Sequence, residues 1–357
     1  MPMRPAPGLV YPQFKRRVPE RVFYFLPALM WLLFSLRHGS LTLPSAANPA
    51  LDAGGLWGES KSQGLSLFGA TGQRFLPPYA MVDCVPGIDR VQTALGQMKT
   101  AGLDFPVVGK PDRGYQGWGV RLLRSPDDLA DYLSLQPDNA SVMLQALIDM
   151  QGEVGVFYIR QPGAAAGRIV SMAFVYPPHV IGDGQHSVAE LVARDPILQA
   201  NATIYRERQP DAWDMVLDKD GFHVLTNARS ARLGAVYRDG LPEVTQALQK
   251  VIDKISQEIP DFHFGRFDIR FRSLAELQQG RGFQIVELNG AGAEMLHIWA
   301  GSGTLLGAWR CLWQQYKTLF SIGAKMRRKG HRPVGLAGMI KLQRQQERLR
   351  KGYPPSS

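Results

Sequence analysis

Two short stretches, GRFDIRF (residues 265–271) and FQIVELNG (residues 283–290), decide the fold and the chemistry of this chain. Both alternate apolar with polar residues, as strands with one buried face do. The alternation places Asp268 on the polar face of the first stretch, and Glu287 with Asn289 on the polar face of the second. Two carboxylates and an amide oxygen are hard ligands of the kind that Mg²⁺ accepts. The stretches therefore predict two strands that carry a magnesium site; solvated sheet edges are the alternative.

A glycine-rich segment upstream, FPVVGKPDRGYQGWGV (residues 105–120), supplies a cation and a flexible loop. A predicted strand ends near Lys110, and Gly114, Gly117 and Gly119 follow. Glycines let successive backbone N–H groups turn toward one anion, and the lysine adds a mobile positive charge. The spacing matches neither a Walker loop nor a dinucleotide fingerprint. We interpret the segment as a phosphate cradle, with a glycine-rich hairpin as the alternative.

Strand-like and helix-like runs alternate along the rest of the chain, which predicts an α+β enzyme built around a cleft. We expect strands over residues 77–83, 105–111, 117–123, 142–148, 153–160, 167–176, 215–218, 223–226, 264–271 and 283–289, and helices over 88–102, 125–135, 187–193, 241–259 and 304–320. Four regions are expected: a preamble with an apolar segment (1–57), a subdomain with the glycine-rich loop (58–145), a subdomain with the magnesium site (146–320) and a basic tail (321–357).

Charge and cysteine content limit the function classes. The 357 residues carry a net charge of +10, but residues 1–21 account for +4 and residues 321–357 for +9, which leaves −3 between them. Basicity is therefore confined to the ends, and no nucleic-acid recognition motif accompanies it. The two cysteines exclude a disulfide framework and fit a reducing compartment. A composition of 45% hydrophobic and 20% charged residues excludes disorder for most of the chain.

The apolar run FYFLPALMWLLFSL (residues 23–36) follows a basic start. As a helix its 14 residues would span roughly 21 Å, short of the roughly 30 Å hydrocarbon core of a bilayer. A membrane span is not expected. Three interpretations stay open: a signal peptide, a buried or amphipathic helix, and an element on a membrane surface.

The order of these motifs resembles the ATP-grasp superfamily, particularly the D-alanine:D-alanine ligase-like carboxylate-amine ligases. The resemblance covers roughly residues 58–300, and VIGDGQHSVAELV (180–192) is similar to a segment of cyanophycin synthetase and bifunctional glutathione synthetase. It implies an α+β ATP-grasp fold, in which two α+β subdomains grip ATP between antiparallel sheets. The segment NGAGAE (289–294) departs from the Ser-Pro-Gly often found there in D-alanine ligases, which argues against D-alanine as the substrate.

The same resemblance implies roles for individual residues. Lys110 would contact the α- and β-phosphates, the loop 114–119 would close over the β- and γ-phosphates, and Arg266 would stabilise a tetrahedral oxyanion. The implied catalytic residues are Arg266 and Lys110; the implied ATP contacts are Lys61, Lys110, Gly114, Tyr115, Gln116, Gly117, Trp118, Gly119, Gln145, Leu147, Glu153, Arg229 and Arg232; the implied metal ligands are Asp268, Glu287 and Asn289.

The substrate side is less defined by the sequence. The loop 47–60 is the candidate for recognition of the acceptor, and Glu294 and His297 are candidates to line the same side. Arg160 is expected at a solvated strand end, with binding of a substrate carboxylate as the alternative.

Together these features predict a cytoplasmic, ATP-dependent ligase that forms carbon–nitrogen bonds through an acylphosphate. ATP and Mg²⁺ are the expected cofactors, with Mn²⁺ as an alternative metal. The expected partners are a small carboxylate and an amine, such as an amino acid or a peptide, and no specific nucleic acid. Contact with an anionic membrane at the inner face and a homodimer are further hypotheses. Two other functions stay open: an ATP-grasp small-molecule kinase and a non-catalytic, membrane-associated nucleotide-binding protein.

Overall fold

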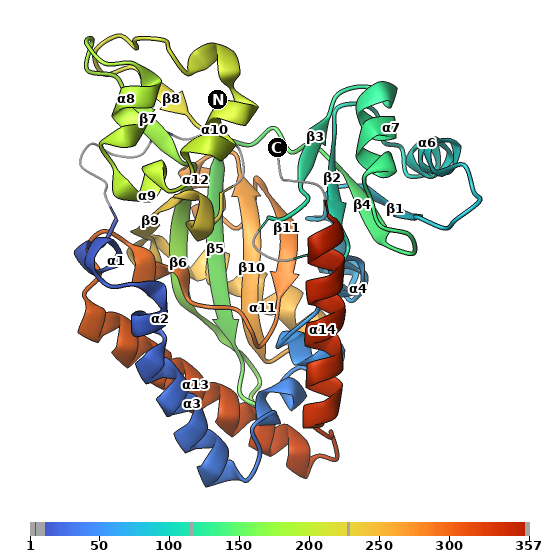
Figure 1. Ribbon diagram of the computed structural model, residues 1–357. Helices are drawn as coiled ribbons and strands as arrows, with labels where there is room; N and C mark the ends of the chain where they lie inside the picture. The colour runs from blue at the N-terminus through green and yellow to red at the C-terminus, as the bar shows by residue number, and fades with distance from the viewer. Residues whose placement is uncertain (1–3, 5–10, 115–116, 227–228, 354–357) are drawn as a thin grey trace.

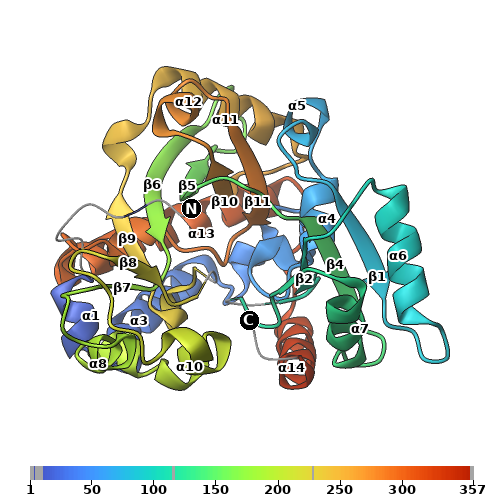
Figure 2. The ribbon, with the colours of Figure 1, turned by 90° about the horizontal axis from the view of Figure 1, so that it is seen from above.

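Two antiparallel sheets contribute to the walls of one cavity in the computed structural model, which describes residues 4, 11–114, 117–226 and 229–353 (Figure 1). Seen from above, α6 and α7 lie on the outer side of one sheet and α11 and α12 on the outer side of the other (Figure 2). Each sheet therefore buries one face under helices and leaves polar side chains on the other face. The α+β class predicted from the sequence is confirmed.

The first sheet comes from residues before 147. Its strands, in spatial order, are β1 (Tyr79–Asp83), β4 (Ser141–Ala146), β2 (Val107–Pro111) and β3 (Arg121–Leu123). The covering helices are α6 (Arg90–Thr100) and α7 (Pro126–Ser134). Both begin at a capping side chain, since Asp89 and Ser125 accept hydrogen bonds from backbone N–H groups of the first turn. Val82, Leu129 and Val142 are buried between this sheet and its helices.

The second sheet carries GRFDIRF (residues 265–271) and FQIVELN (residues 283–289) on two neighbouring strands. Its strands, in spatial order, are β11 (Phe283–Asn289), β10 (Phe264–Phe271), β5 (Gly152–Ile159), β6 (Arg168–Tyr176) and β9 (Val236–Asp239). Helices α11 (Gln246–Glu258) and α12 (Leu274–Gln278) cover its outer face. The apolar side of α11, including Ile252 and Ile255, joins Phe267 and Ile269 in one buried core.

A small satellite unit is inserted between β6 and β9. It contains β7 (His179–Ile181), α8 (Val188–Ala193), α9 (Pro196–Gln199), α10 (Ala202–Arg208) and β8 (Phe222–Val224). The GDGQH segment explains how α8 begins: the Asp183 carboxylate accepts hydrogen bonds from the backbone N–H groups of Gln185 and His186, and Ser187 with Glu190 forms a capping box.

One predicted strand, over residues 215–218, is wrong. This stretch has only an isolated bridge, between Val216 and Ser187, and no strand. The backbone carbonyls of Trp213 and Met215 instead accept hydrogen bonds from the N–H groups of Ala189 and Val188. They satisfy donors in the first turn of α8, which have no partner within the helix.

The N-terminal segment packs against the second sheet's side of the molecule. It forms α1 (Gln13–Arg17), α2 (Glu20–Phe23) and α3 (Phe25–His38), and α3 lies along α13 (Leu305–Arg328). The rings of Tyr316 and Phe320 meet Trp31 edge-on. The apolar run is therefore an amphipathic helix, with Met30 and Phe34 buried and Phe25 exposed. None of the described helices is long and apolar enough to cross a membrane.

The basic C-terminal segment folds back onto the first subdomain. Helix α13 continues through residue 320, where the tail was expected to begin, and α14 (Leu336–Gly352) follows it. At the end of α14 the buried Tyr353 donates a hydrogen bond of 2.9 Å to the carbonyl of Arg113, at the base of the glycine-rich loop. The remaining short helices are η1 (Leu43–Ala46), η2 (Asp52–Gly55), α4 (Lys61–Ser66), α5 (Ala70–Gln73), η3 (Pro210–Ala212), η4 (Ala231–Leu233), η5 (Leu241–Glu243) and η6 (Leu296–Trp299).

Candidate active site

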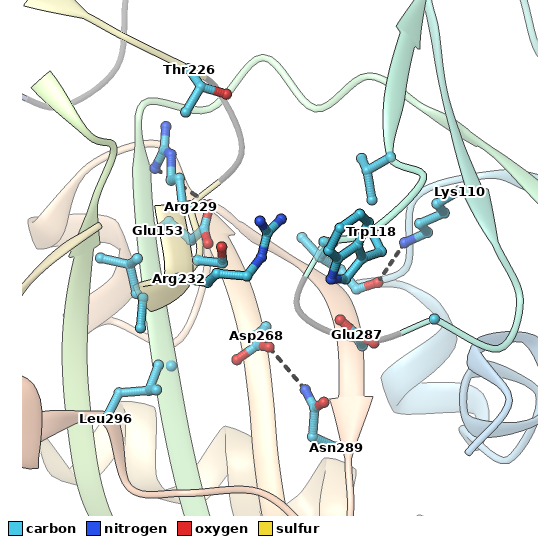
Figure 3. A pocket seen from close by; sticks show the side chains of 18 of the residues that line it. Lys110, Trp118, Glu153, Thr226, Arg229, Arg232, Asp268, Glu287, Asn289 and Leu296 are labelled. Atoms are coloured by element: carbon cyan, nitrogen blue, oxygen red, sulfur yellow. Dashed lines mark hydrogen bonds and ion pairs between the residues drawn. The ribbon is translucent and has the colours of Figure 1, made fainter. Parts of the chain in front are cut away.

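A cavity of about 2010 Å³ is lined by both sheets, the loop after η2 and the N-terminal helices. It collects residues that lie far apart in the sequence, and Figure 3 shows part of the lining. Those predicted site residues that line it are Lys61, Lys110, Gly114, Gly117, Trp118, Gln145, Leu147, Glu153, Arg229, Arg232, Arg266, Asp268, Glu287 and Asn289. Gly119 lies in the same loop but is not among the lining residues, and Tyr115 and Gln116 lie outside the described residues.

The polar residues of β10 and β11 share the cavity face of the second sheet. In the antiparallel register Asp268 pairs with Glu287 and Arg266 pairs with Asn289. The intervening residues of β10, such as Phe267, point into the core and are fully buried. A register shift after Asp268 accommodates one extra residue in β11, Val286, so that the adjacent Val286 and Glu287 both line the cavity, while Asn289 shares the face of Glu287 by alternation.

Asp268 is the centre of a hydrogen-bonded group on this face. The guanidinium of Arg266 donates to both carboxylate oxygens, at 2.6 and 3.0 Å. The Asn289 side chain donates its Nδ2 to Asp268 Oδ2 at 2.9 Å, which leaves the amide oxygen of Asn289 available for another ligand (Figure 3). Burial raises the pKa of Asp268, although Arg266 opposes the rise. A further cation in this place would favour the ionised carboxylate.

Two lysines face these carboxylates from the other side of the cavity. The buried Lys110, on β2, donates from Nζ to Gln145 Oε1 at 2.9 Å and to the Val286 carbonyl at 3.4 Å. Burial lowers the pKa of Lys110 to about 8. Lys61, at the start of α4, holds its Nζ 3.3 Å from Glu287 Oε1.

These cations decide the protonation of Glu287. Burial alone would raise the pKa of its carboxyl, but Lys61, Lys110 and Arg266 outweigh burial, and the pKa of Glu287 lies below its ordinary value. Glu287 is therefore a carboxylate at neutral pH and can act as a ligand for a metal ion.

The donor set of this face is suited to a magnesium ion that also binds phosphates. No three His, Cys, Asp or Glu side chains cluster closely enough to hold a metal alone within the part of the chain that the structure describes. Asp268, Glu287 and the Asn289 amide oxygen would supply a partial set of oxygen ligands. Mg²⁺ is usually bound in this way, by one or two carboxylates with substrate phosphates and water completing the octahedron.

The glycine-rich loop connects β2 to β3 and reaches across the cavity. Gly119 has a φ of +70°, and a Cβ there would lie 2.8 Å from Pro111 Cγ, so the turn requires glycine. The indole ring of Trp118 lies under the guanidinium of Arg232, with the guanidinium carbon 4.5 Å from the ring centroid. Arg232 belongs to η4, on the far side of the cavity, so this contact joins the loop to the second subdomain (Figure 3).

Two arginines share one carboxylate beside this contact. Arg270 donates from a terminal nitrogen to Glu153 Oε2 at 2.8 Å, and a terminal nitrogen of Arg229 lies 3.4 Å from the same oxygen. Burial lowers the pKa of Arg229 to about 10, still well above neutral. The group therefore keeps a net positive charge, which favours an anionic ligand. Glu153, which the resemblance implied as an ATP contact, is already engaged by these arginines.

The end of the cavity beyond Arg266 has a different lining. Glu294 accepts hydrogen bonds from the Tyr24 hydroxyl at 2.8 Å and from the Trp299 indole N–H at 3.4 Å. Burial raises the pKa of the Glu294 carboxyl. The aromatic side chains of Phe14 and Phe23 line the same end. The sequence had offered Glu294 for this side, whereas the contributions of the aromatic residues were missed.

Of three other residues considered for the substrate side, one lines the cavity and two do not. In the loop 47–60, Glu59 lines the cavity, accepts a hydrogen bond of 3.1 Å from the Gly290 N–H, and has a pKa raised to about 8 by burial and by Glu287. His297 bonds to Ser171 at 2.7 Å and is not among the lining residues. Arg160 is also absent from the lining, and it donates to the Phe262 carbonyl at 3.4 Å.

Gly155 is a glycine in the middle of a strand, a feature of the sequence that was not used to predict the site. A Cβ at this position of β5 would lie 3.0 Å from Arg266 Cδ and 2.8 Å from Leu296 Cδ1. Gly155 faces Asp268 in the register of the sheet. A glycine in the middle of a strand often marks a close approach of another group, and here it makes room for the arginine.

No protein-family model and no curated protein matches the chain. Among solved structures it is similar to a bifunctional glutathione synthetase from Pasteurella multocida (18% identity, 70% of this chain and 35% of that one, TM-score 0.40). It is also similar to the VanG D-Ala:D-Ser ligase from Enterococcus faecalis (14% identity, 74% and 64%, TM-score 0.39) and to the D-alanine–D-alanine ligase from Bacillus anthracis (12% identity, 76% and 72%, TM-score 0.41).

The chain spans 35% of the length of the glutathione synthetase and 64% of that of the D-Ala:D-Ser ligase. The identities to these three structures lie between 12% and 18%, and the TM-scores are near 0.4.

Proposed function

We propose that the chain is an ATP-dependent carboxylate–amine ligase of the ATP-grasp type, which forms an amide or peptide bond through an acylphosphate and releases ADP and phosphate. One observation carries the proposal: two charged walls face each other across a single cavity. Lys110 on the first sheet and Lys61 at the start of α4 both face Asp268 and Glu287 on the second sheet, with Lys61 Nζ only 3.3 Å from Glu287 Oε1. Phosphoryl transfer needs mainly positioning and neutralisation of charge, which such walls provide.

The nucleotide would lie between the two sheets. Lys110 and Lys61 would contact its phosphates, and the loop 114–119 would cover them. The amide nitrogen of Gln145 is buried and has no hydrogen-bond partner within the described part of the chain. An unpaired buried donor is costly, so a ligand acceptor such as an adenine nitrogen would relieve it. Leu147, in the segment that joins the sheets, would flank the base.

Asp268, Glu287 and Asn289 would hold Mg²⁺, or Mn²⁺ in its place. When bound, the ion would neutralise the phosphate oxygens and favour transfer of the γ-phosphoryl group. The arginine pair on Glu153, together with Arg232, would bind the same anion from the side of the second subdomain.

The reaction follows from this arrangement. A carboxylate oxygen of the first substrate attacks the γ-phosphorus, the bond to the bridging oxygen of ADP breaks, and an acylphosphate forms. The amine of the second substrate then attacks the acyl carbon. Arg266 would stabilise the developing oxyanion, and collapse of the tetrahedral species expels phosphate. The amine loses a proton in this step.

Glu294 is the group that we assign to the amine. It lies directly past Arg266, whose terminal nitrogen donates to the Glu294 backbone carbonyl at 3.0 Å. Its carboxylate would bind the substrate ammonium group and accept the proton as the new bond forms. The Tyr24 hydroxyl fixes the carboxylate through a hydrogen bond of 2.8 Å.

The test is ADP release by the purified protein with ATP and Mg²⁺ over a panel of amino-acid and peptide pairs. We expect release of ADP and phosphate with at least one pair, and loss of tight nucleotide binding in Asp268→Asn and Glu287→Gln. A phosphorylated product without an amide would instead identify a small-molecule kinase. Absence of ADP release, together with unchanged nucleotide affinity in both variants, would refute the proposal.

A further inference from the structure

Helix α3, with Val22 at the end of α2, exposes a series of apolar side chains on the outside of the molecule. We call this surface the α3 face; it consists of the side chains of Val22, Phe25, Leu29, Leu32, Leu33 and Leu36, which are 48–73% exposed. Their spacing of three or four residues places most of them along one side of a helix. Single exposed apolar residues are normal on a protein surface, but a contiguous patch of this kind marks an interaction site.

The opposite side of α3 explains why these residues remain outside. Met30 and Phe34 are buried, and the Phe34 ring contacts Trp313 and Phe320 of α13. The helix is therefore already seated on the protein by one side. Figure 1 shows α3 lying beside α13 at the lower edge of the molecule.

Acidic residues are nearly absent from the stretches of sequence that form and flank the α3 face. No Asp or Glu occurs between Arg21 and Leu51 or between Met295 and Gln346, the two stretches that contain α3 and α13. Glu20, just before the face begins, is the nearest acid in the sequence. Exposed basic residues on and beside these two helices include Arg17, Arg21, Arg37, Arg310, Lys317, Arg327 and Arg328. A patch with an apolar centre and a basic surround is complementary to an anionic surface that has an apolar interior.

We propose that the α3 face binds the surface of an anionic lipid bilayer, with α3 lying in the plane of the interface. The helix has 14 residues, too few to cross the hydrocarbon core, and none of the described helices qualifies as a membrane span. A second copy of the chain fits less well, because a twofold contact through this face would bring the same arginines of both copies together.

Binding in this orientation has a consequence for the cavity. Phe23 and Tyr24 line the cavity, and Val22 and Phe25, their neighbours in the chain, belong to the α3 face. Residues 22–25 therefore touch both the membrane and the end of the cavity beyond Arg266. The C-terminal helix α14, which carries much of the terminal charge, is not part of this surface.

The experiment uses the full chain and vesicles of two compositions, phosphatidylcholine alone and phosphatidylcholine mixed with phosphatidylglycerol. Flotation measures the bound fraction at low and high salt. We expect the protein to bind the anionic vesicles and to bind the neutral ones at least about tenfold more weakly. The double variant Leu29→Gln with Leu33→Gln should weaken binding to anionic vesicles at least about tenfold, since two leucines no longer enter the interface.

Two further variants distinguish the contribution of the basic residues from that of exposed leucines in general. Arg310→Gln with Lys317→Gln should reduce binding to anionic vesicles and lessen its dependence on salt. Leu135→Gln removes another exposed leucine, 50% exposed and on the first subdomain, and should leave binding unchanged. Unchanged melting temperatures and nucleotide affinities would show that the variants are folded.

Three outcomes would overturn the proposal. One is failure of the unmodified protein to bind anionic vesicles, and another is equal binding by the leucine variant. The third is a dimer, measured by light scattering, that the leucine variant abolishes while vesicle binding stays absent; this would assign the α3 face to a second copy. None of these outcomes depends on the ligase activity, so they leave the proposed function untouched.

Discussion

The two ends of the cavity differ in how they are built. At one end, Lys110 on β2 and Asp268 and Glu287 on β10 and β11 are held by strands of two sheets. At the other end, Tyr24 comes from the N-terminal segment and Trp299 from η6, outside both sheets. At the first end, lysine side chains lie opposite carboxylates. At the second end, aromatic side chains surround a single carboxylate, that of Glu294.

The charged end would bind the nucleotide and its metal, which are the same in every reaction of this type. The aromatic end would bind the part of the substrates that differs from one ligase to another. Strand-borne charges are fixed by hydrogen bonds along the sheet and suit a constant ligand such as a nucleotide with its metal. An aromatic wall built from helices outside the sheets can change shape without disturbing the strands. Arg266 lies at the boundary, because it bonds to Asp268 on one side and to the Glu294 backbone on the other.

The largest effect is expected from Arg266, which belongs to both ends. Arg266→Gln should lower kcat of amide formation by about 10²- to 10³-fold, the usual cost of one lost oxyanion donor. Nucleotide affinity should change far less, because Lys110 and Lys61 remain. Steady-state kinetics and equilibrium nucleotide binding would measure the two quantities.

Arg266→Lys serves as the control for charge. It keeps a cation beside the buried Asp268, whereas Arg266→Gln leaves that carboxylate without its partner, which costs stability. Melting temperatures would show whether either variant is unfolded. A folded Arg266→Gln variant with unaltered kcat would exclude the assigned role.

The second effect concerns the aromatic end alone. Glu294→Gln should lower kcat/KM for the amine by about 10- to 100-fold, as expected when a general base is lost. Burial raises the pKa of Glu294, so activity should fall as the pH drops through this raised pKa, and the variant should lose that acid limb. A pH–rate profile measures this effect.

Glu20→Gln is the matched variant for this prediction. Glu20 also lines the cavity, but its side chain is exposed and takes no part in the proposed reaction. It should behave like the unmodified protein. If both variants lose the same activity, the effect would be one of general negative charge rather than of a base at Glu294.

The grouping of side chains at the charged end could be predicted from the sequence for a physical reason. Alternation along a strand fixes which side chains share a face, so Asp268, Glu287 and Asn289 could be grouped before their contacts were known. The spacing of Lys110 and the glycines likewise depends on one local turn. These are short-range relations within single elements, and they appear directly in the order of residues.

The aromatic end could not be predicted in the same way. Tyr24 and Glu294 are 270 positions apart, and their hydrogen bond depends on how α3 packs against α13. Glu153 illustrates a related limit: its cross-strand partner Arg270 depends on the pairing of β5 with β10, which no single stretch of sequence reveals. The strand at 215–218 was mistaken because a short apolar run does not show that its carbonyls serve a helix start.

A third, smaller effect is a pH dependence of ATP affinity, which we expect to arise from Lys110 at the charged end. The pKa of Lys110 is lowered to about 8 by burial, so its amine is charged below pH 8 and progressively neutral above it. A neutral amine cannot balance a phosphate, and ATP affinity at pH 9 should be about tenfold weaker than at pH 7. Equilibrium binding of ATP with Mg²⁺ at the two pH values measures the change.

Two variants assign this pH dependence to a residue. Lys110→Arg keeps its charge at pH 9 and should bind ATP with little dependence on pH. Glu59 also has a pKa of about 8, and Glu59→Gln should keep the tenfold loss if Lys110 is the source. An equal loss in Lys110→Arg, or its disappearance in Glu59→Gln, would move the titrating group away from Lys110.

The smallest effect is expected where the loop of the first subdomain meets the second. Trp118→Leu removes the ring that lies 4.5 Å from the Arg232 guanidinium, a contact worth about 0.5–1 kcal/mol, or a two- to fivefold change in the rate of nucleotide dissociation. The amine KM should stay unchanged, because Trp118 lies at the charged end. Stopped-flow displacement of a fluorescent nucleotide measures the rate. Arg232→Lys keeps a cation above the ring and should give a smaller change than Trp118→Leu. If Trp118→Leu alters the amine KM more than the nucleotide rate, the two ends are coupled through the loop, and the separation between them fails.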